Sequence, residues 1–156
     1  MNKKGFTLVE LLAVITLLSI LMAIAVPNVI STINNNKRNT FLTDAGRVIA
    51  KAEYLVASSK TARDELKKGN DVTYYMDSSG LNEKQEFQTD TDGGVYDASS
   101  YVKVSKDETS NTYTYCICII GSKRKISKST ANTCNVSKND CLIRDELTGI
   151  SVVKDK

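Results

Sequence analysis

One carboxylate lies inside the longest apolar stretch of the chain, close to a glycine that precedes it. Glu10 is followed by sixteen residues, 11–26, of which all but two are apolar. A carboxylate within such a segment costs about 2.5–3.5 kcal/mol on membrane-insertion scales and therefore needs a partner. Cleavage between Gly5 and Phe6 would create an α-amine one helical turn from Glu10. That amine, or the amine of a neighbouring copy, would neutralise the carboxylate.

The same segment is long enough to cross a bilayer. Residues 6–26 form a stretch of 21 residues, which as a helix with a rise of about 1.5 Å per residue spans roughly 30 Å. No charged residue lies between Glu10 and Lys37. Two lysines, at positions 3 and 4, precede the segment, so the positive-inside rule predicts a cytoplasmic N-terminus. Pro27 removes a backbone donor and predicts a kink or local unwinding at the outer edge.

These residues resemble the type IV pilins and their relatives, the pseudopilins. The resemblance lies in Lys-Lys-Gly followed by Phe6-Thr7-Leu8-Val9-Glu10 and a long apolar helix that carries Pro27. It covers roughly residues 1–55 and is closest to the type IVa-like branch with a short class III leader. It implies that a prepilin peptidase removes residues 1–5 and methylates the amine of Phe6. It also implies that an inner-membrane assembly platform packs the subunits into a helical homopolymer, with Glu10 paired to the amine of an adjacent subunit.

The resemblance implies a structural role rather than an enzymatic one. The expected function is that of a type IV pilus subunit serving adhesion, twitching motility or DNA uptake, first held in the cytoplasmic membrane and then placed in an extracellular pilus. The alternative is a pseudopilin of a type II secretion or competence machine. Two further alternatives are a secretory signal peptide cleaved after Ala23-Ile24-Ala25 and a plain membrane anchor. The mature N-terminus separates them, because it would be Phe6, Val26 or Met1 respectively.

Composition agrees with a role that involves no catalysis. The chain has no histidine, and the nucleophile and base arrangements that enzymes usually carry are missing from its sequence. We therefore expect no enzyme activity and no cofactor. The net charge is +3, and loss of the two leader lysines leaves 19 basic and 18 acidic side chains. A generally basic surface is therefore not present, and nucleic acid as a partner is left undecided.

Four cysteines all lie in the part predicted to be exported, where disulfides form. Cys116 and Cys118 are two apart in an apparent strand and point from the same face, an awkward geometry for a bond to each other. We therefore predict that this pair bonds to Cys134 and Cys141. A four-thiolate zinc site is the alternative, although the spacing departs from the usual C-x₂₋₄-C.

Two polar clusters are weaker candidate sites. Asp90, Asp92 and Asp97, together with two glycines, could bind calcium, but the twelve-residue loop with its terminal glutamate is missing, and a solvated turn is favoured. A basic cluster is interpreted as a solvated loop in preference to a binding patch for DNA or another surface. It consists of Lys123, Arg124, Lys125 and Lys128.

The predicted fold is α+β, with a long N-terminal helix packed on a small antiparallel β-sheet. We divide the chain into a leader (1–5), a transmembrane and filament-core helix (6–33), an amphipathic continuation of that helix (34–69) and a β domain with four cysteines (70–156). The amphipathic part, which ends at Gly69-Asn70, carries a stripe with helical spacing. The stripe consists of Phe41, Ala45, Val48, Ala52, Leu55, Ser59, Ala62 and Leu66, widened by Leu42, Ile49 and Val56.

Alternation of apolar residues predicts the strands. Residues 101–105 and 112–120 alternate well and are separated by a polar six-residue loop, which predicts a hairpin. The prediction is completed by a short run at 72–76, a third strand of the sheet at 125–129 and a closing strand at 150–153.

Overall fold

The computed structural model describes residues 7–77, 80–82, 86–107, 110–149 and 152–156. The chain divides into two compact units, which we call the stalk unit, Met1–Asn36, and the head unit, Lys37–Lys156. One helix, α1 (Leu8–Ser58), contributes residues to both units.

In the stalk unit the described residues are helical from Leu8 onward and exposed throughout. α1 is long and apolar enough to cross a membrane, and none of its most apolar stretch is buried. Pro27 lies inside the helix, and the residues on both sides of it keep the helical conformation. Local unwinding at Pro27 is therefore not present in this structure, and a kink, the other predicted outcome, stays a prediction.

In the head unit the predicted amphipathic stretch forms two helices instead of one. α1 ends at Ser58, and α2 (Lys60–Lys67) begins after Ser59, whose backbone is extended. The hydroxyl of Ser59 accepts a hydrogen bond from the backbone N–H of Ala62 at 3.2 Å. Serine competes with the helical backbone in this way and is favoured as an N-cap. The predicted stop is confirmed, because Gly69 follows α2 with a φ of 83°.

The strands form one antiparallel sheet. They are β1 (Val72–Tyr75), β2 (Tyr101–Lys106), β3 (Tyr113–Ile120), β4 (Arg124–Ile126), β5 (Leu142–Ile143) and β6 (Lys154–Asp155). The order along the sheet is β1-β2-β3-β4-β6, and β5 pairs with β3 beside this path. The 3₁₀ helices η1 (Val136–Lys138) and η2 (Arg144–Glu146) lie on either side of β5 in the sequence.

The predicted hairpin is confirmed by the pairing of β2 with β3, in which Tyr101 lies opposite Cys118. The third strand is shorter than predicted and begins one residue earlier, at Arg124. The closing strand is Lys154–Asp155 and not 150–153, of which residues 150 and 151 lie outside the described residues. β5 had not been predicted, because two residues are too few to show alternation.

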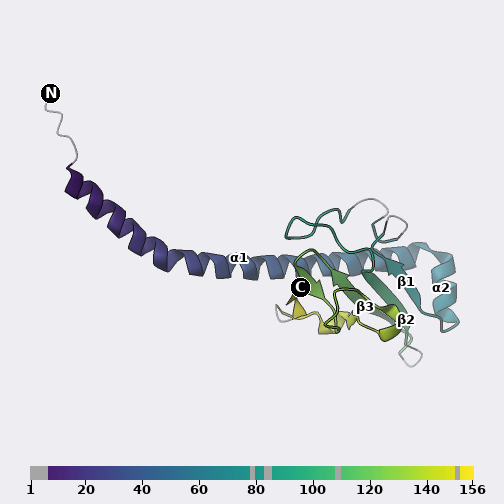
Figure 1. Cartoon of the computed structure of the whole chain (residues 1–156). Coiled ribbons are helices and arrows are strands. Elements are labelled where there is room, and N and C mark those ends of the chain that lie inside the picture. Colours follow the sequence, from purple (N-terminus) through teal and green to yellow (C-terminus); the bar gives the residue numbers. More distant parts are fainter. Residues whose placement is uncertain (1–6, 78–79, 83–85, 108–109, 150–151) are drawn as a thin grey trace. The chain divides into compact units, whose positions relative to one another are not determined.

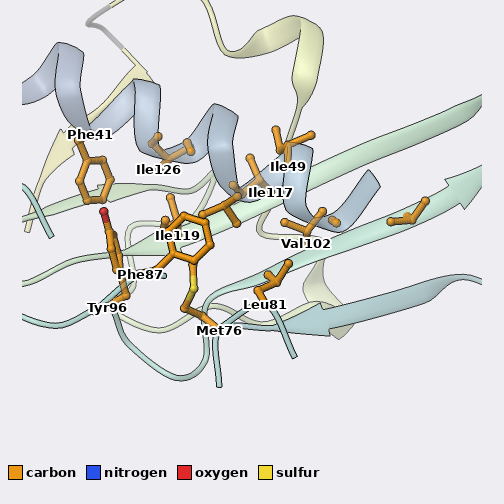
Figure 2. Packing of buried hydrophobic residues seen from close by; sticks show 14 of the residues in the cluster. Phe41, Ile49, Met76, Leu81, Phe87, Tyr96, Val102, Ile117, Ile119 and Ile126 are labelled. Atoms are coloured by element: carbon orange, nitrogen blue, oxygen red, sulfur yellow. The ribbon is translucent and has the colours of Figure 1, made fainter. Parts of the chain in front are cut away.

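The main core lies between α1 and one face of the sheet. Phe41, Val48 and Ile49 of α1 are buried against Ile117 and Ile119 of β3. Figure 2 shows Phe41, Ile49, Ile117 and Ile119 together with residues of the loop that connects β1 and β2. That loop covers part of the same core, with Leu81, Phe87 and Tyr96 buried. The predicted stripe is therefore confirmed as a buried face, although it is divided between α1 and α2. Within the head unit, α1 runs along the sheet (Figure 1).

A second, smaller cluster lies on the opposite face of β3. It consists of Tyr101, Cys118 and Cys141, with Cys116, Cys134 and Val136 packed against it. Successive residues of a strand point to opposite faces, so the cysteines of β3 face away from Ile117 and Ile119.

Candidate functional site

The first turn of α1 holds the carboxylate of Glu10. The backbone N–H and the hydroxyl of Thr7 both donate to Glu10 Oε2 at 2.9 Å, and the N–H of Glu10 is 3.3 Å from Thr7 Oγ1. This reciprocal arrangement is a capping box, with threonine followed three residues later by glutamate. Gly5 and Phe6 lie outside the described residues. Thr7 had no role in the sequence-based prediction, although its spacing from Glu10 matches the capping pattern.

Large apolar side chains cover the stalk helix and are solvent-exposed. From Leu8 to Ile33 they include leucines, isoleucines and valines that are 47–81% exposed. Four polar side chains in the segment bond back to the helix: Thr16 Oγ1 donates to the carbonyl of Ala13 at 2.8 Å and Ser19 Oγ to that of Ile15 at 2.7 Å, and Asn28 and Thr32 do the same. A helix whose polar groups are satisfied internally suits a lipid or helix-packed environment.

Two disulfides attach the segment after β4 to β3. Cys116 bonds to Cys141 and Cys118 to Cys134, so each cysteine of the C-x-C pair reaches one of the two later cysteines. This connectivity agrees with the prediction from strand geometry. The cystines close loops with sequence separations of 25 and 16 residues. With the sulfurs bonded in pairs, the thiolates that the zinc alternative requires are not available.

Asp90 holds together a tight turn formed by residues 90–94 of the head unit. Its carboxylate accepts hydrogen bonds from the backbone N–H groups of Asp92 and Gly94, both at 2.9 Å, and from that of Ser122. Burial alone would raise the pKa of Asp90, but the hydrogen bonds from Ser122, Gly94 and Asp92 outweigh it and lower the pKa. The turn at 90–94 is thereby attached to the connection between β3 and β4.

Asp92 is bound by two cations from distant parts of the sequence. Its side chain is 2% exposed and pairs with Arg124, which is 7% exposed, and with Lys37 Nζ at 3.1 Å. Burial would raise the pKa of Asp92, but hydrogen bonds and charge from Arg124 and Lys37 lower it. The three residues were assigned to different elements in the sequence analysis, and only the fold brings them together.

Calcium binding at the aspartates is not favoured by these contacts. The carboxylates of Asp90 and Asp92 face N–H donors and cations, and Asp97 Oδ1 accepts from the N–H of Ser99 at 2.8 Å. Within the described residues, no group of three or more His, Cys, Asp or Glu side chains is placed to hold a metal ion. Calcium at this turn therefore stays a hypothesis from the sequence.

The basic cluster at 123–128 is not the solvated loop that was expected. Arg124 and Lys125 lie in β4 and are buried. Lys125 Nζ donates to the carbonyls of Thr130 and Ala131, at 2.5 and 2.9 Å. Lys128 pairs with Glu146 at 3.4 Å. The sequence showed the charges but not their partners, which are the distant Asp92 for Arg124 and the nearby carbonyls of Thr130 and Ala131 for Lys125.

A hollow of about 330 Å³ beside α1 shows no catalytic arrangement. Tyr96 Oη donates to Asp44 Oδ2 at 3.0 Å, and Arg47 is 3.3 Å from Asp44 Oδ1, so these three lining residues bind one another. Burial raises the pKa of Tyr96, and the charge of Asp44 adds to this. The tyrosine is therefore a neutral hydrogen-bond donor at physiological pH.

Comparison with known proteins matches only the start of the chain. Residues 1–26 match the family model described as the prokaryotic N-terminal methylation motif. No curated protein and no solved structure matches the chain. The matched region contains Gly5, Phe6 and Glu10 together with most of the apolar stretch of α1.

Proposed function

We propose that this type IV pilin-like protein, which carries a class III leader, is the structural subunit of a helical filament. Prepilin peptidase removes residues 1–5 and methylates the amine of Phe6. Residues 6–33 then act first as a transmembrane helix and later as filament core, and residues 34–69 and 70–156 form the part displayed outside. The partners are related subunits, the peptidase and an inner-membrane assembly platform.

The observation that carries this proposal is the contrast between the two units. Every described residue from Thr7 to Asn36 is exposed, although most of them are apolar. The head unit, in contrast, has a buried apolar core of its own. An apolar surface of this extent requires cover, which lipid supplies before assembly and the helices of neighbouring subunits supply afterwards.

Glu10 supplies the specificity that apolar packing lacks. Lipid tails are as apolar as leucine, so burial alone does not select one stagger of neighbouring helices. Pairing the Glu10 carboxylate with the methylated amine of Phe6 on an adjacent subunit would fix that stagger. In a single copy, the two donors of Thr7 already satisfy the carboxylate in part.

The N-terminus of the mature protein tests the processing step. Intact-mass and N-terminal analysis of the membrane-extracted protein should give a chain that begins at Phe6 and carries one added methyl group. A chain that begins at Val26 or retains Met1 would overturn the proposal. Gly5→Ala keeps the apolar helix unchanged and should accumulate as the unprocessed precursor, which makes it the matched control.

The position of the filament separates a pilus from a pseudopilus. Immunogold electron microscopy with antibody against the head unit should show label along fibres that extend beyond the envelope. Label confined to the envelope, in cells that still process the protein, would instead identify a pseudopilin of a secretion or competence machine. Adhesion, twitching motility and DNA uptake are then distinguished by the phenotype of cells that lack the protein.

A further inference from the structure

The head unit begins at two adjacent cations of α1. Residues 7–36 are all exposed, and Lys37 and Arg38 are the first residues along the helix that are not. Both side chains reach acidic groups that lie far along the chain. Lys37 Nζ is 3.1 Å from Asp92 Oδ1, and Arg38 Nη2 is 2.5 Å from Asp155 Oδ2.

The two ion pairs differ in environment. Asp155 is 66% exposed, and exposed pairs of this kind contribute about 0–1 kcal/mol. Asp92 is 2% exposed and also holds the buried Arg124, so its contact with Lys37 is a charge-assisted bond at the edge of a water-excluded network. Lys37 itself is 40% exposed, so its ammonium gives up only part of its hydration when it joins the network.

Asp92 is held in place by a rigid turn. The carboxylate of Asp90 binds the N–H groups of Asp92 and Gly94, and a side chain at Gly94 would overlap Ser122. A side chain at Gly121 would meet both the Asp90 carboxylate and the ring of Phe41 in α1. The turn, the β3–β4 connection and α1 are thus packed without spare space at this level of the helix.

We propose that Lys37, Asp92 and Arg124 form a clasp, by which we mean these three paired side chains. The clasp determines the residue of α1 at which packing against the rest of the head unit begins. The stretch before this point contains Asn34, Asn35 and Pro27, residues that weaken a helix. Bending or stretching of that stretch stops at the clasp and does not spread into the core that begins at Phe41. The clasp does not depend on the proposed function, whereas its use as a stop for strain within a filament does.

Hydrogen exchange of the full chain in detergent micelles tests the clasp. Lys37→Met removes the cation and leaves the buried Asp92–Arg124 pair intact, so the head unit keeps its fold. Loss of a charge-assisted hydrogen bond should speed exchange of the amides of residues 37–42 about tenfold. Amides in β2 and β3 should exchange at the wild-type rate, and Lys37→Arg should restore protection to within about twofold.

Lys51→Met is the matched control. Lys51 lies in α1, fourteen residues after Lys37. It pairs at 3.2 Å with Glu86, which lies in the same β1–β2 loop as Asp92. Its loss should leave residues 37–42 unchanged. Equal exchange at residues 37–42 in the two methionine variants would overturn the clasp.

A double variant shows whether the effect runs through Asp92. In an Asp92→Asn background that still protects β2 and β3, Lys37→Met should add no further exchange, and a further tenfold increase would contradict the proposal. If Asp92→Asn unfolds the head unit, the exchange rates of residues 37–42 in Lys37→Met and Lys51→Met decide whether the clasp exists. The measurement uses unassembled protein, so absence of filaments would count against the proposed function and leave the clasp standing.

Discussion

Glu10 is the residue on which assembly is expected to depend. Glu10→Ala removes the carboxylate but leaves residues 1–9 and the apolar helix, so the leader should still be cleaved. Without the pair to the Phe6 amine, we expect at least tenfold less variant protein in sheared filaments, relative to the membrane fraction, by immunoblot. Thr16→Ala is the control, because Thr16 bonds only to its own helix. Normal incorporation of Glu10→Ala would remove the registration role.

Asp92 should be the acidic side chain that matters most for stability in this part of the head unit. Asp92→Asn leaves Arg124 buried without its countercharge, and breaking a buried pair in this way costs about 3–5 kcal/mol. Asp155→Asn breaks an exposed pair and should cost less than about 1 kcal/mol. Urea denaturation of the two variants at neutral pH measures the difference. Similar midpoints would show that the Asp92 network contributes little.

Acid should destabilise the head unit through the same carboxylates. The pKa values of Asp90, Asp92 and Asp97 are lowered in the folded chain, so their stabilisation is present above the ordinary aspartate pKa of about 3.9. It is lost as the pH falls through the lowered values, because the unfolded chain then binds more protons. We expect urea midpoints to be level from pH 7 to pH 5 and to fall below pH 4. Asp92→Asn should flatten that fall, whereas an identical profile would exclude Asp92 as its source.

At the scale of elements, the two cystines fasten the segment after β4 to the outer face of the sheet. Their loops of 25 and 16 residues predict about 3 kcal/mol or slightly more for each bond. Cys118→Ser with Cys134→Ser should therefore lower the free energy of unfolding by about 2–4 kcal/mol, measured by denaturant titration. Non-reducing peptide mapping should recover the two predicted linkages. One equivalent of bound zinc in the purified protein would instead support the four-thiolate alternative.

Elements with a strong local pattern were predictable from the sequence. The stripe on α1 and the alternation of β2 and β3 located the helix face and the hairpin, and Gly69 marked the end of α2. The division at Ser59 was missed because an apolar stripe carries no information about capping. β5 and the burial of Arg124 were missed because both depend on partners distant in sequence.

The candidate site shows the same division. Gly5, Phe6 and Glu10 were assigned to processing and pairing through a family resemblance carried by one short contiguous segment, and these roles stay predictions. The link from Lys37 to Asp92 spans 55 positions and is invisible in any local window. The sequence indicates Asp92 as a possible calcium ligand, because it shows the carboxylate but not the cations that the fold brings to it.

At the scale of the whole molecule, the chain separates its apolar residues into two environments. Those from Leu8 to Ile33 are exposed and require cover, whereas the head unit has a buried apolar core that begins at Phe41. Among residues 7–36, the part of the stalk unit that the structure describes, none belongs to the core clusters of the head unit. We therefore expect folding of the head unit and the proposed assembly through the stalk unit to be separable.

Removal of residues 1–33 should separate these properties directly. A chain of residues 34–156, secreted with its cysteines oxidised, keeps α1 from before the clasp and every residue of the described cores. We expect it to be a monomer without detergent, by size exclusion with light scattering, and to unfold cooperatively within about 1 kcal/mol of the full chain. It should not enter filaments. Aggregation of this chain, or loss of its cooperative transition, would show that the stalk unit is needed for the head unit to fold.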